Sequence, residues 1–478
     1  MKKIINLGLL GTMVMALFAS CSDFLDIESP TTVRTDAYFK STSDFTSAVS
    51  GVYNGLRSYY GNFYEVAELP SDNAQINGYN LGVAPLDQLT WITSTASIQN
   101  RWTISYALVA RANVVEARLT NFEMEKALKD QYLGEVRFIR ALMYFNLVQF
   151  FGDVPLVVKE ITSENEAYSY KRSPVAEIYA QVERDLLSAV ELLPDAYNAA
   201  NAGRITKGAA RSLLGKVYVT NKQFDKAVPV LKSVVASDQY KLLPQYASVF
   251  DIANKNNAEM VFAVQYLGGT GFSEGSNFSI LFAPFGSGTE ITSGGIPASA
   301  NGGTLDLFNA FEAGDLRKPV SIAFWPTTDS LYYTRKFLDK PVASNEGKND
   351  WPVIRYSDVL LLLSEAYNET GTVSDALPLI NAVRKRAGLA NLSGLDQAAL
   401  RSAIQHERRV ELCFEGHRWF DLLRTGTMLS TMRAYKEKYI KYGGYLVPNY
   451  EVTDAKVRFP VPFRELSLNP ELGQNDGY

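Results

Sequence analysis

The chain is poor in the side chains that most often bind transition metals. Its 478 residues include only two cysteines, Cys21 and Cys413, and two histidines, His406 and His417. Zinc sites need several such ligands close together, and the cysteines lie near opposite ends of the chain. A Cys/His metal site is therefore excluded, whereas a calcium site built only from carboxylates stays open.

An excess of positive charge is also missing. The 47 Lys and Arg residues face 51 Asp and Glu residues, which gives a formal net charge of −4. Proteins that bind nucleic acids carry clustered Lys and Arg for the phosphates, so we expect no nucleic-acid partner. The hydrophobic share of 46% is typical of a folded globular chain rather than a disordered one.

Sequence motifs for common enzyme chemistry are absent. The chain contains no glycine-rich phosphate loop after a strand, no Gly-x-Ser-x-Gly motif and no His-Glu-x-x-His motif. The sequence thus indicates no cofactor and no catalytic residues. Glycoside hydrolysis stays open, because its two carboxylates need not be neighbours in sequence.

The N-terminus carries a long apolar run that is typical of an export signal. Two lysines precede residues 4–19, which are mainly apolar and end at small side chains. The run is short for a membrane-spanning helix, so we expect a signal peptide over 1–20. Residues 17–21 (LFASC) resemble a bacterial lipobox, which predicts lipidation of Cys21. The alternative is an ordinary secreted protein with an incidental cysteine.

Hydrophobic side chains recur at spacings of three and four residues, which predicts amphipathic helices. The segments with this pattern are 44–60, 102–119, 132–151, 178–193, 209–219 and 359–367. Alternating strand patterns are scarce, and 260–266 is the clearest of them. The predicted fold class is mainly α, with a few short strands.

Two of these segments belong to an internal repeat that aligns without gaps. The shared pattern is Leu-Leu-x-x-small-Tyr followed by Ala, Pro and Val, at Leu213, Leu214, Val217, Tyr218, Ala227, Pro229 and Val234 and again at Leu362, Leu363, Ala366, Tyr367, Ala376, Pro378 and Val383. Such pairs predict a tetratricopeptide-like scaffold, an α/α superhelix of stacked helix pairs. A chance match between two amphipathic hairpins is the alternative.

Two segments are rich in loop-forming residues. Of the 37 residues in 268–304, 10 are glycine and only Glu274 and Glu290 are charged. Its aromatic and aliphatic residues argue against disorder, so we expect it to pack on the helical body. The second segment, 71–99, is rich in amides and aromatics. We expect both to be long irregular insertions.

A dense ionic segment at 406–421 could be mistaken for a catalytic site. Glu407, Glu411 and Glu415 are spaced one helical turn apart, and Arg408 is spaced one turn from Glu411. Ion pairs along a helix explain this pattern better than an acid–base pair, so we expect a structural network. Cys413 lies between two apolar residues and is predicted to be a buried side chain rather than a nucleophile.

Uncharged polar groups beside aromatic rings are the chemistry that a neutral sugar needs, since the rings stack on C–H faces while amides and carboxylates bind hydroxyls. The predicted ligand-binding residues in the insertions are Asp72, Asn73, Asn77, Tyr79, Trp91, Phe272, Trp325 and Tyr332. For each aromatic residue, a place in the core is the alternative.

Taken together, these segments resemble the SusD/RagB nutrient-binding outer-membrane lipoproteins. The matching motifs extend from the lipidated start at Cys21 to the end of the chain: Trp102-x3-Tyr106, Glu135-x-Arg137-Phe-x-Arg140, Phe151-Gly-Asp-Val-Pro155, Arg355-Tyr356-x-Asp358, Glu407-Arg-Arg409-x-Glu411, Glu415-Gly-x-Arg418-Trp-x-Asp421 and Asn469-Pro470.

The resemblance implies a single domain over 21–478. Helix pairs would occupy roughly 36–250 and 351–425, and ligand-binding insertions roughly 71–100 and 268–350. It also implies a surface-exposed, lipid-anchored protein of the outer membrane without enzymatic activity, which acts as a lid on a SusC-like TonB-dependent β-barrel transporter. Most relatives bind glycans, so an oligosaccharide ligand is preferred. A peptide ligand, as in the RagB branch, a cell-surface glycosidase and a pure scaffold are the alternatives.

Overall fold

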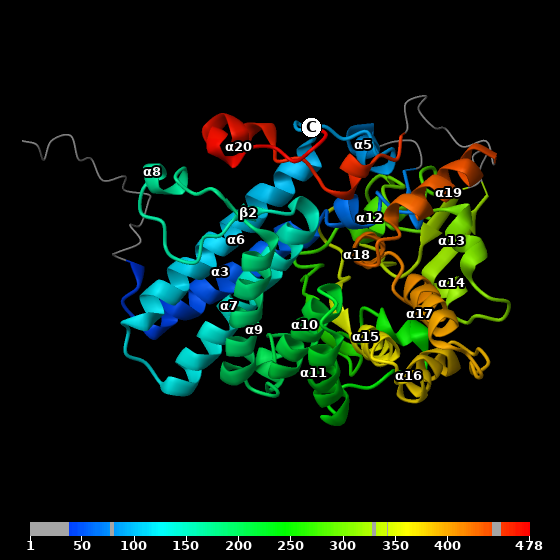
Figure 1. The fold of residues 1–478 in the computed structure, drawn as a ribbon, viewed down its shortest axis with the longest axis horizontal. Helices are drawn as coiled ribbons and strands as arrows, with labels where there is room; N and C mark the ends of the chain where they lie inside the picture. Colours follow the sequence, from blue (N-terminus) through cyan, green and yellow to red (C-terminus); the bar gives the residue numbers. More distant parts are fainter. Residues whose placement is uncertain (1–37, 77–80, 327–330, 342, 442–450) are drawn as a thin grey trace, which may run out of the picture. The chain divides into compact units, whose positions relative to one another are not determined.

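Helices dominate the computed structural model, which describes residues 38–76, 81–326, 331–341, 343–441 and 451–478 (Figure 1). The chain divides into residues 1–47 and 48–478. In the first part, the Asp44 carboxylate accepts hydrogen bonds from the N–H groups of Lys40 and Ser41 near the start of α3 (Thr42–Tyr60). The predicted signal peptide and Cys21 lie outside the described residues.

All six predicted helices are confirmed, with ends that differ by a few residues. They are α3, α6 (Ala96–Thr120), α7 (Lys126–Phe151), α9 (Val175–Leu192), α10 (Lys207–Thr220) and α15 (Tyr356–Glu369). The ends of α7 show how local chemistry fixes such limits. The Glu125 carboxylate accepts hydrogen bonds from the N–H groups of Ala127 and Leu128, and the helix stops at Gly152, whose φ is +75°.

The predicted repeat is confirmed as two helix pairs. The first consists of α10 and α11 (Phe224–Ala236), and the second of α15 and α16 (Val373–Arg386). The two turns contain Lys222 and Gly371 at equivalent positions, and both residues have positive φ, +57° and +83°. Because α11 packs on α15, the pairs are neighbours, as a tetratricopeptide-like scaffold requires (Figure 1).

Small residues let the helices of each pair approach closely. A Cβ atom on Gly215 of α10 would lie 2.3 Å from Leu231 Cδ2 of α11, so only glycine fits there. At the equivalent position of the second pair, the Ser364 hydroxyl donates a hydrogen bond to the Ala376 carbonyl at 2.8 Å. Small side chains at this position thus hold both pairs together.

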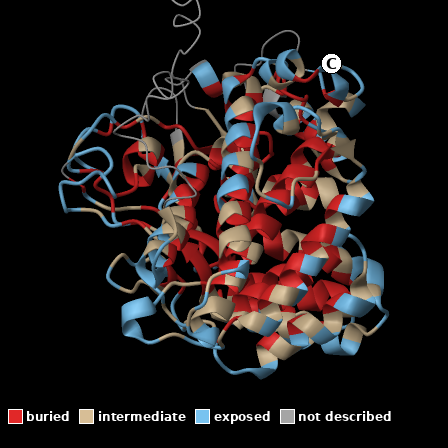
Figure 2. Cartoon of the chain, turned by 90° about the vertical axis from the view of Figure 1, so that its left-hand side faces the viewer, coloured by how far each residue is buried: buried red, intermediate tan, exposed pale blue. Residues whose placement is uncertain are grey.

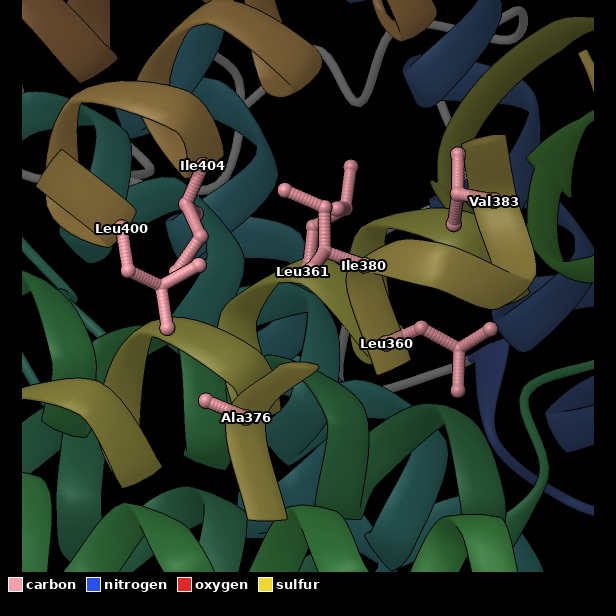
Figure 3. Close-up of a cluster of buried hydrophobic side chains, with 7 residues drawn as sticks. All are labelled: Leu360, Leu361, Ala376, Ile380, Val383, Leu400 and Ile404. Atoms are coloured by element: carbon pink, nitrogen blue, oxygen red, sulfur yellow. The ribbon is translucent and has the colours of Figure 1, made fainter. Parts of the chain in front are cut away.

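The core of the second pair is completed by α17 (Gln397–Glu411). Buried side chains from α15, α16 and α17 meet in one hydrophobic cluster (Figure 3): Leu360, Leu361, Ala376, Ile380, Val383, Leu400 and Ile404. Buried positions also dominate the inner faces of the other long helices (Figure 2). A helix pair cannot bury its apolar face alone, so each pair depends on the next element along the scaffold.

The predicted strand at 260–266 is confirmed as β4 (Met260–Val264), which pairs antiparallel with β8 (Trp351–Arg355). The glycine-rich insertion folds back onto this region. Phe278 and Phe282 of α12 (Phe278–Phe282) are buried, with ring centroids 5.2 Å from Trp351 and 5.0 Å from Tyr64, respectively. The expectation that the insertion packs on the helical body is therefore confirmed.

The remaining elements are short, apart from α19. The helices are α4 (Tyr64–Ala67), α5 (Ala84–Asp87), α8 (Glu164–Ala167), α13 (Leu305–Ala310), α14 (Lys318–Ser321), α18 (Arg418–Arg424), α19 (Met428–Lys441) and α20 (Phe463–Leu468). The strands are β1 (Ala74–Gln75), β2 (Val154–Pro155), β3 (Arg172–Ser173), β5 (Gly302–Gly303), β6 (Ile322–Trp325) and β7 (Leu331–Thr334). Within the described ranges, no helix combines the length and apolarity needed to cross a bilayer.

Candidate functional site

A small antiparallel sheet joins the two predicted ligand-binding insertions. Its strand order is β1-β5-β7-β6, so β1 from the first insertion pairs with β5 from the second. Ala74 lies opposite Gly303, and Gly303 lies opposite Tyr332. Segments more than 200 residues apart in sequence thus form one structural unit, which we call the loop sheet.

The loop sheet is anchored to the ionic helical segment beneath it. Both oxygens of the Asp72 carboxylate accept hydrogen bonds from Arg418, at 2.7 and 2.9 Å, and Arg409 forms an ion pair with the same group at 2.9 Å. Burial alone would raise the pKa of Asp72, but the two arginines outweigh it and lower the pKa to about 2. Asp72 is therefore ionised and fully paired at neutral pH.

The structure does not support a ligand-binding role for Asp72 or Asn73. Both are buried, with 2% and 0% of their surface exposed. The Thr304 hydroxyl donates to the Asp72 carbonyl, and Arg409 donates to the Asn73 side-chain oxygen at 2.8 Å. These polar residues tie the first insertion to the scaffold, because a buried carboxylate or amide needs such partners.

Trp91 is also a core residue, which corrects its prediction as a stacking platform. Only 1% of its surface is exposed, and its indole N–H donates to the Tyr478 hydroxyl at 2.5 Å. Its ring packs edge-on against Phe459, with centroids 4.9 Å apart. The C-terminal segment thus covers Trp91, and the alternative of a place in the core was the right one.

Phe272, in contrast, is 81% exposed and lies on a turn. The Glu346 carboxylate accepts four backbone hydrogen bonds from this turn, three of them from the consecutive residues Gly269, Thr270 and Gly271 at 2.6–3.3 Å. The hydrogen bond from the Gly271 N–H and the other backbone hydrogen bonds of the turn lower the pKa of Glu346, so its carboxylate stays ionised at neutral pH. Hydrogen bonds to Glu346 thus hold the backbone of the turn, while the Phe272 ring faces solvent.

The strands β6 and β7 place a second group of aromatic rings at the loop sheet. Phe324 is 46% exposed, and its ring centroid lies 5.5 Å from that of Tyr332 in a tilted arrangement. The Tyr332 ring lies 4.8 Å from that of Phe308 of α13. Trp325 and Tyr332 are half-buried. Because neighbouring residues of a strand point to opposite faces, Phe324 and Trp325 lie on different sides of the sheet.

The sequence pattern predicts Trp325, but not Phe324, as a site residue. Both occur in the same Phe-Trp-Pro tripeptide, and only the strand register decides which ring shares a face with Tyr332. Phe285, 41% exposed, was also missed. The predicted contacts Asn77 and Tyr79 lie outside the described residues.

The ionic segment forms a buried network rather than an open acid–base site. Arg317 forms ion pairs with Asp315, Glu407 and Glu411. Arg355 forms ion pairs with Glu259, Glu411 and Glu415. All of these side chains are at most 1% exposed. Cys413 is likewise buried, as predicted. In the parts of the chain that the structure describes, no three His, Cys, Asp or Glu side chains are arranged to hold a metal ion.

Comparison with known proteins decides the family. Residues 321–478 match the model described as "SusD family", and residues 23–219 match the model described as "Starch-binding associating with outer membrane". The chain belongs to the SusD/RagB family. This finding confirms the resemblance drawn from the sequence motifs.

Individual SusD-like proteins match over almost the whole chain. SusD-like protein P25 of Formosa agariphila is 26% identical over 99% of this chain and 98% of its own length. Starch-binding protein SusD of Bacteroides thetaiotaomicron is 23% identical over 91% of this chain and 88% of its own. Among solved structures, a laminarin-binding SusD-like protein has a TM-score of 0.79 at 26% identity and covers 92% of this chain and 100% of its own. The likeness confirms the predicted fold class.

Proposed function

We propose that this chain captures oligosaccharides at its loop region, which we define as residues 71–100 and 268–350. The observation that carries the proposal is the exposure of aromatic rings on anchored backbone. Of the four exposed phenylalanines among the described residues, three lie in this region: Phe272, Phe285 and Phe324. Aromatic rings that face solvent in a region of uncharged polar groups can stack on the C–H face of a sugar.

The local chemistry favours a neutral sugar over a charged ligand. Residues 268–304 contain only two charged side chains, and Glu346 and Asp72 are already satisfied by protein donors. Aromatic faces then supply the contact with the C–H face of a sugar ring, and backbone and amide groups supply hydrogen bonds. Relatives named as starch-binding and laminarin-binding support the same ligand class.

The anchored loops also suit the capture of long chains. Because Glu346 and the Asp72–Arg418 pair hold the backbone in place, little conformational entropy is lost when a ligand binds. Relatives are named as binding proteins, and we propose that this chain likewise binds without cleaving. A glycosidase would instead release shortened products during prolonged incubation.

We further propose that Cys21 is acylated, that the chain is anchored to the outer surface of the outer membrane, and that it delivers its ligand to a SusC-like TonB-dependent β-barrel transporter. The lipobox-like residues 17–21 and the outer-membrane wording of the family model support this placement. Purification from native outer membranes tests the partnership: the chain should co-purify with a β-barrel of that class. A Cys21→Ser variant should lose its membrane attachment.

Substitution of the exposed rings tests the binding role. Phe272→Ala and Phe324→Ala should each weaken binding of laminarin or starch by about two- to twelvefold, which corresponds to about 0.5–1.5 kcal/mol per aromatic contact. Phe463→Ala is the matched control, because Phe463 is 62% exposed but lies on α20, outside the loop region. Calorimetric titration of all three variants provides the measurement.

Three outcomes would contradict the proposal. Unchanged glycan affinity in the Phe272→Ala/Phe324→Ala variant would remove the proposed site. A heat signal from a peptide mixture, with none from any glycan, would favour the peptide-capturing alternative. Release of oligosaccharide products from a bound polysaccharide would favour the glycosidase alternative.

A further inference from the structure

A polar cleft is formed by residues outside the loop region. It has a volume of about 740 Å³ and is lined by the C-terminal end of α7, by α9, by the end of α10, by α18 and by residues 454–458 and 474–476. No residue of 71–100 or 268–350 contributes to it. α7 and α9 pack side by side here (Figure 1), and the C-terminal segment forms the other wall.

The C-terminal wall of this cleft is held rigidly. Arg172 donates to the Leu472 carbonyl and to the Asn475 side-chain oxygen, both at 2.7 Å. The Asn475 amide donates in turn to the carbonyls of Phe151 and Phe459, both at 2.8 Å. Gln474 exchanges a pair of hydrogen bonds with the Val461 backbone. The cleft is therefore preorganised, since these bonds fix its shape before any ligand arrives.

Other polar groups of the cleft have no partner among the described residues. The Tyr179 hydroxyl, the Arg458 guanidinium and the Asp476 carboxylate make no side-chain hydrogen bond or ion pair there. Asp153 uses one carboxylate oxygen to accept the Val175 N–H at 2.9 Å and keeps the other available. The cleft thus offers both hydrogen-bond donors and acceptors, whereas the polar groups of its C-terminal wall are already paired.

The Arg458 guanidinium lies close to the backbone of Gly152, the residue that ends α7. A Cβ atom at residue 152 would lie 2.8 Å from the Arg458 guanidinium, and Gly152 has a φ of +75°. The glycine that ends α7 therefore also makes room for the guanidinium group. Arg458 is exposed, so its guanidinium is accessible from the cleft.

The composition of the cleft points to an uncharged polyhydroxylated ligand. Its walls include three arginines and three aspartates, so no net charge selects an ion. Valines and a leucine provide apolar surface beside the polar groups. A volume of about 740 Å³ lies within the roughly 300–1,000 Å³ of small-molecule sites. We propose that this cleft is a second carbohydrate site, which binds a short oligosaccharide independently of the loop region.

The test separates the two sites in the full chain, purified in detergent, with laminaritriose and maltotriose as probes. The Phe272→Ala/Phe324→Ala variant weakens the loop region and serves as the background. Calorimetric titration of this variant should still detect one binding event with at least one triose. Adding Arg458→Ala and Asp476→Asn should weaken that event at least tenfold, because both charged partners of the sugar hydroxyls are lost.

A matched control removes the same charges elsewhere. Lys126 and Asp130 form an exposed ion pair at the other end of α7, so Lys126→Ala/Asp130→Asn should leave triose binding unchanged. The proposal is overturned if the background variant binds neither triose, or if its binding survives the Arg458→Ala/Asp476→Asn change. Binding of a dipeptide such as Ala-Ala in place of both trioses would also overturn it. Loss of binding only on substitution of the loop phenylalanines would support the proposed function and overturn this second site.

Discussion

The substitution Arg355→Met tests whether the buried ionic network stabilises the helical scaffold. Arg355 is 1% exposed and donates hydrogen bonds to three carboxylates: Glu415 at 2.6 Å, Glu259 at 2.7 Å and Glu411 at 3.0 Å. Methionine fills a similar volume but supplies no charge and no donor. All three carboxylates would then share fewer cations in a region without solvent.

The expected loss of stability depends on the ion pairs that remain after the substitution. Lys336 still pairs with Glu415, and Arg386 still pairs with Glu259 and Glu411, so no carboxylate becomes wholly isolated. Removing one partner of a buried ion pair costs about 3–5 kcal/mol of the free energy of unfolding. Since a typical domain is stable by only about 5–15 kcal/mol, Arg355→Met should bring the protein close to unfolding at room temperature.

Urea denaturation followed by tryptophan fluorescence measures the effect, and Trp351 in the same strand is a nearby reporter. Arg401→Met is the matched control, because Arg401 is 40% exposed and pairs with Glu369 on the surface. That change should cost less than about 1 kcal/mol. If both variants lose the same small amount of stability, the buried network does not stabilise the scaffold.

Three further predictions concern other residues. Lys222→Gly should raise the stability by about 0.5–1 kcal/mol, because Lys222 has a φ of +57° where the repeat has Gly371; an unchanged urea midpoint would contradict this. Burial raises the pKa of Glu68 to about 8, against an ordinary value of 4.5. Between these two pH values the folded state keeps a proton that the unfolded state releases. The free energy of unfolding should therefore fall by about 1.4 kcal/mol per pH unit as the pH rises from 4.5 to 8. Glu68→Gln should remove this fall, which urea titrations of both chains at several pH values would show. Cys413, 1% exposed, should react with a thiol reagent only after denaturation, and rapid labelling of the native chain would refute its burial.

Periodicity alone was sufficient to predict the helical scaffold. The spacing of apolar residues indicated α6, α7, α9, α10 and α15 within a few residues, because a helix face repeats locally and needs no knowledge of distant segments. The repeat could be found for the same reason, since each helix pair carries its own packing residues. The buried state of Cys413 followed from its apolar neighbours in the sequence. The ionic segment is structural, as predicted, but the predicted ion pairs along one helix are wrong: α17 ends at Glu411, and the glutamates pair with Arg317, Lys336 and Arg355 from distant segments.

Whether the candidate site residues are exposed depends on long-range contacts, which a local sequence pattern does not show. Asp72 and Trp91 have the residue types of a sugar site, yet Arg418 and Tyr478, more than 300 residues away in sequence, take them into the interior. Phe324 and Trp325 are adjacent in sequence, and only the pairing of β6 with β7 puts Phe324 beside Tyr332. Local sequence patterns were enough to predict the helices and the kinds of side chain present in the loops. Which of those side chains face solvent depends on the distant segments that pack against them, so it is visible only in the folded chain.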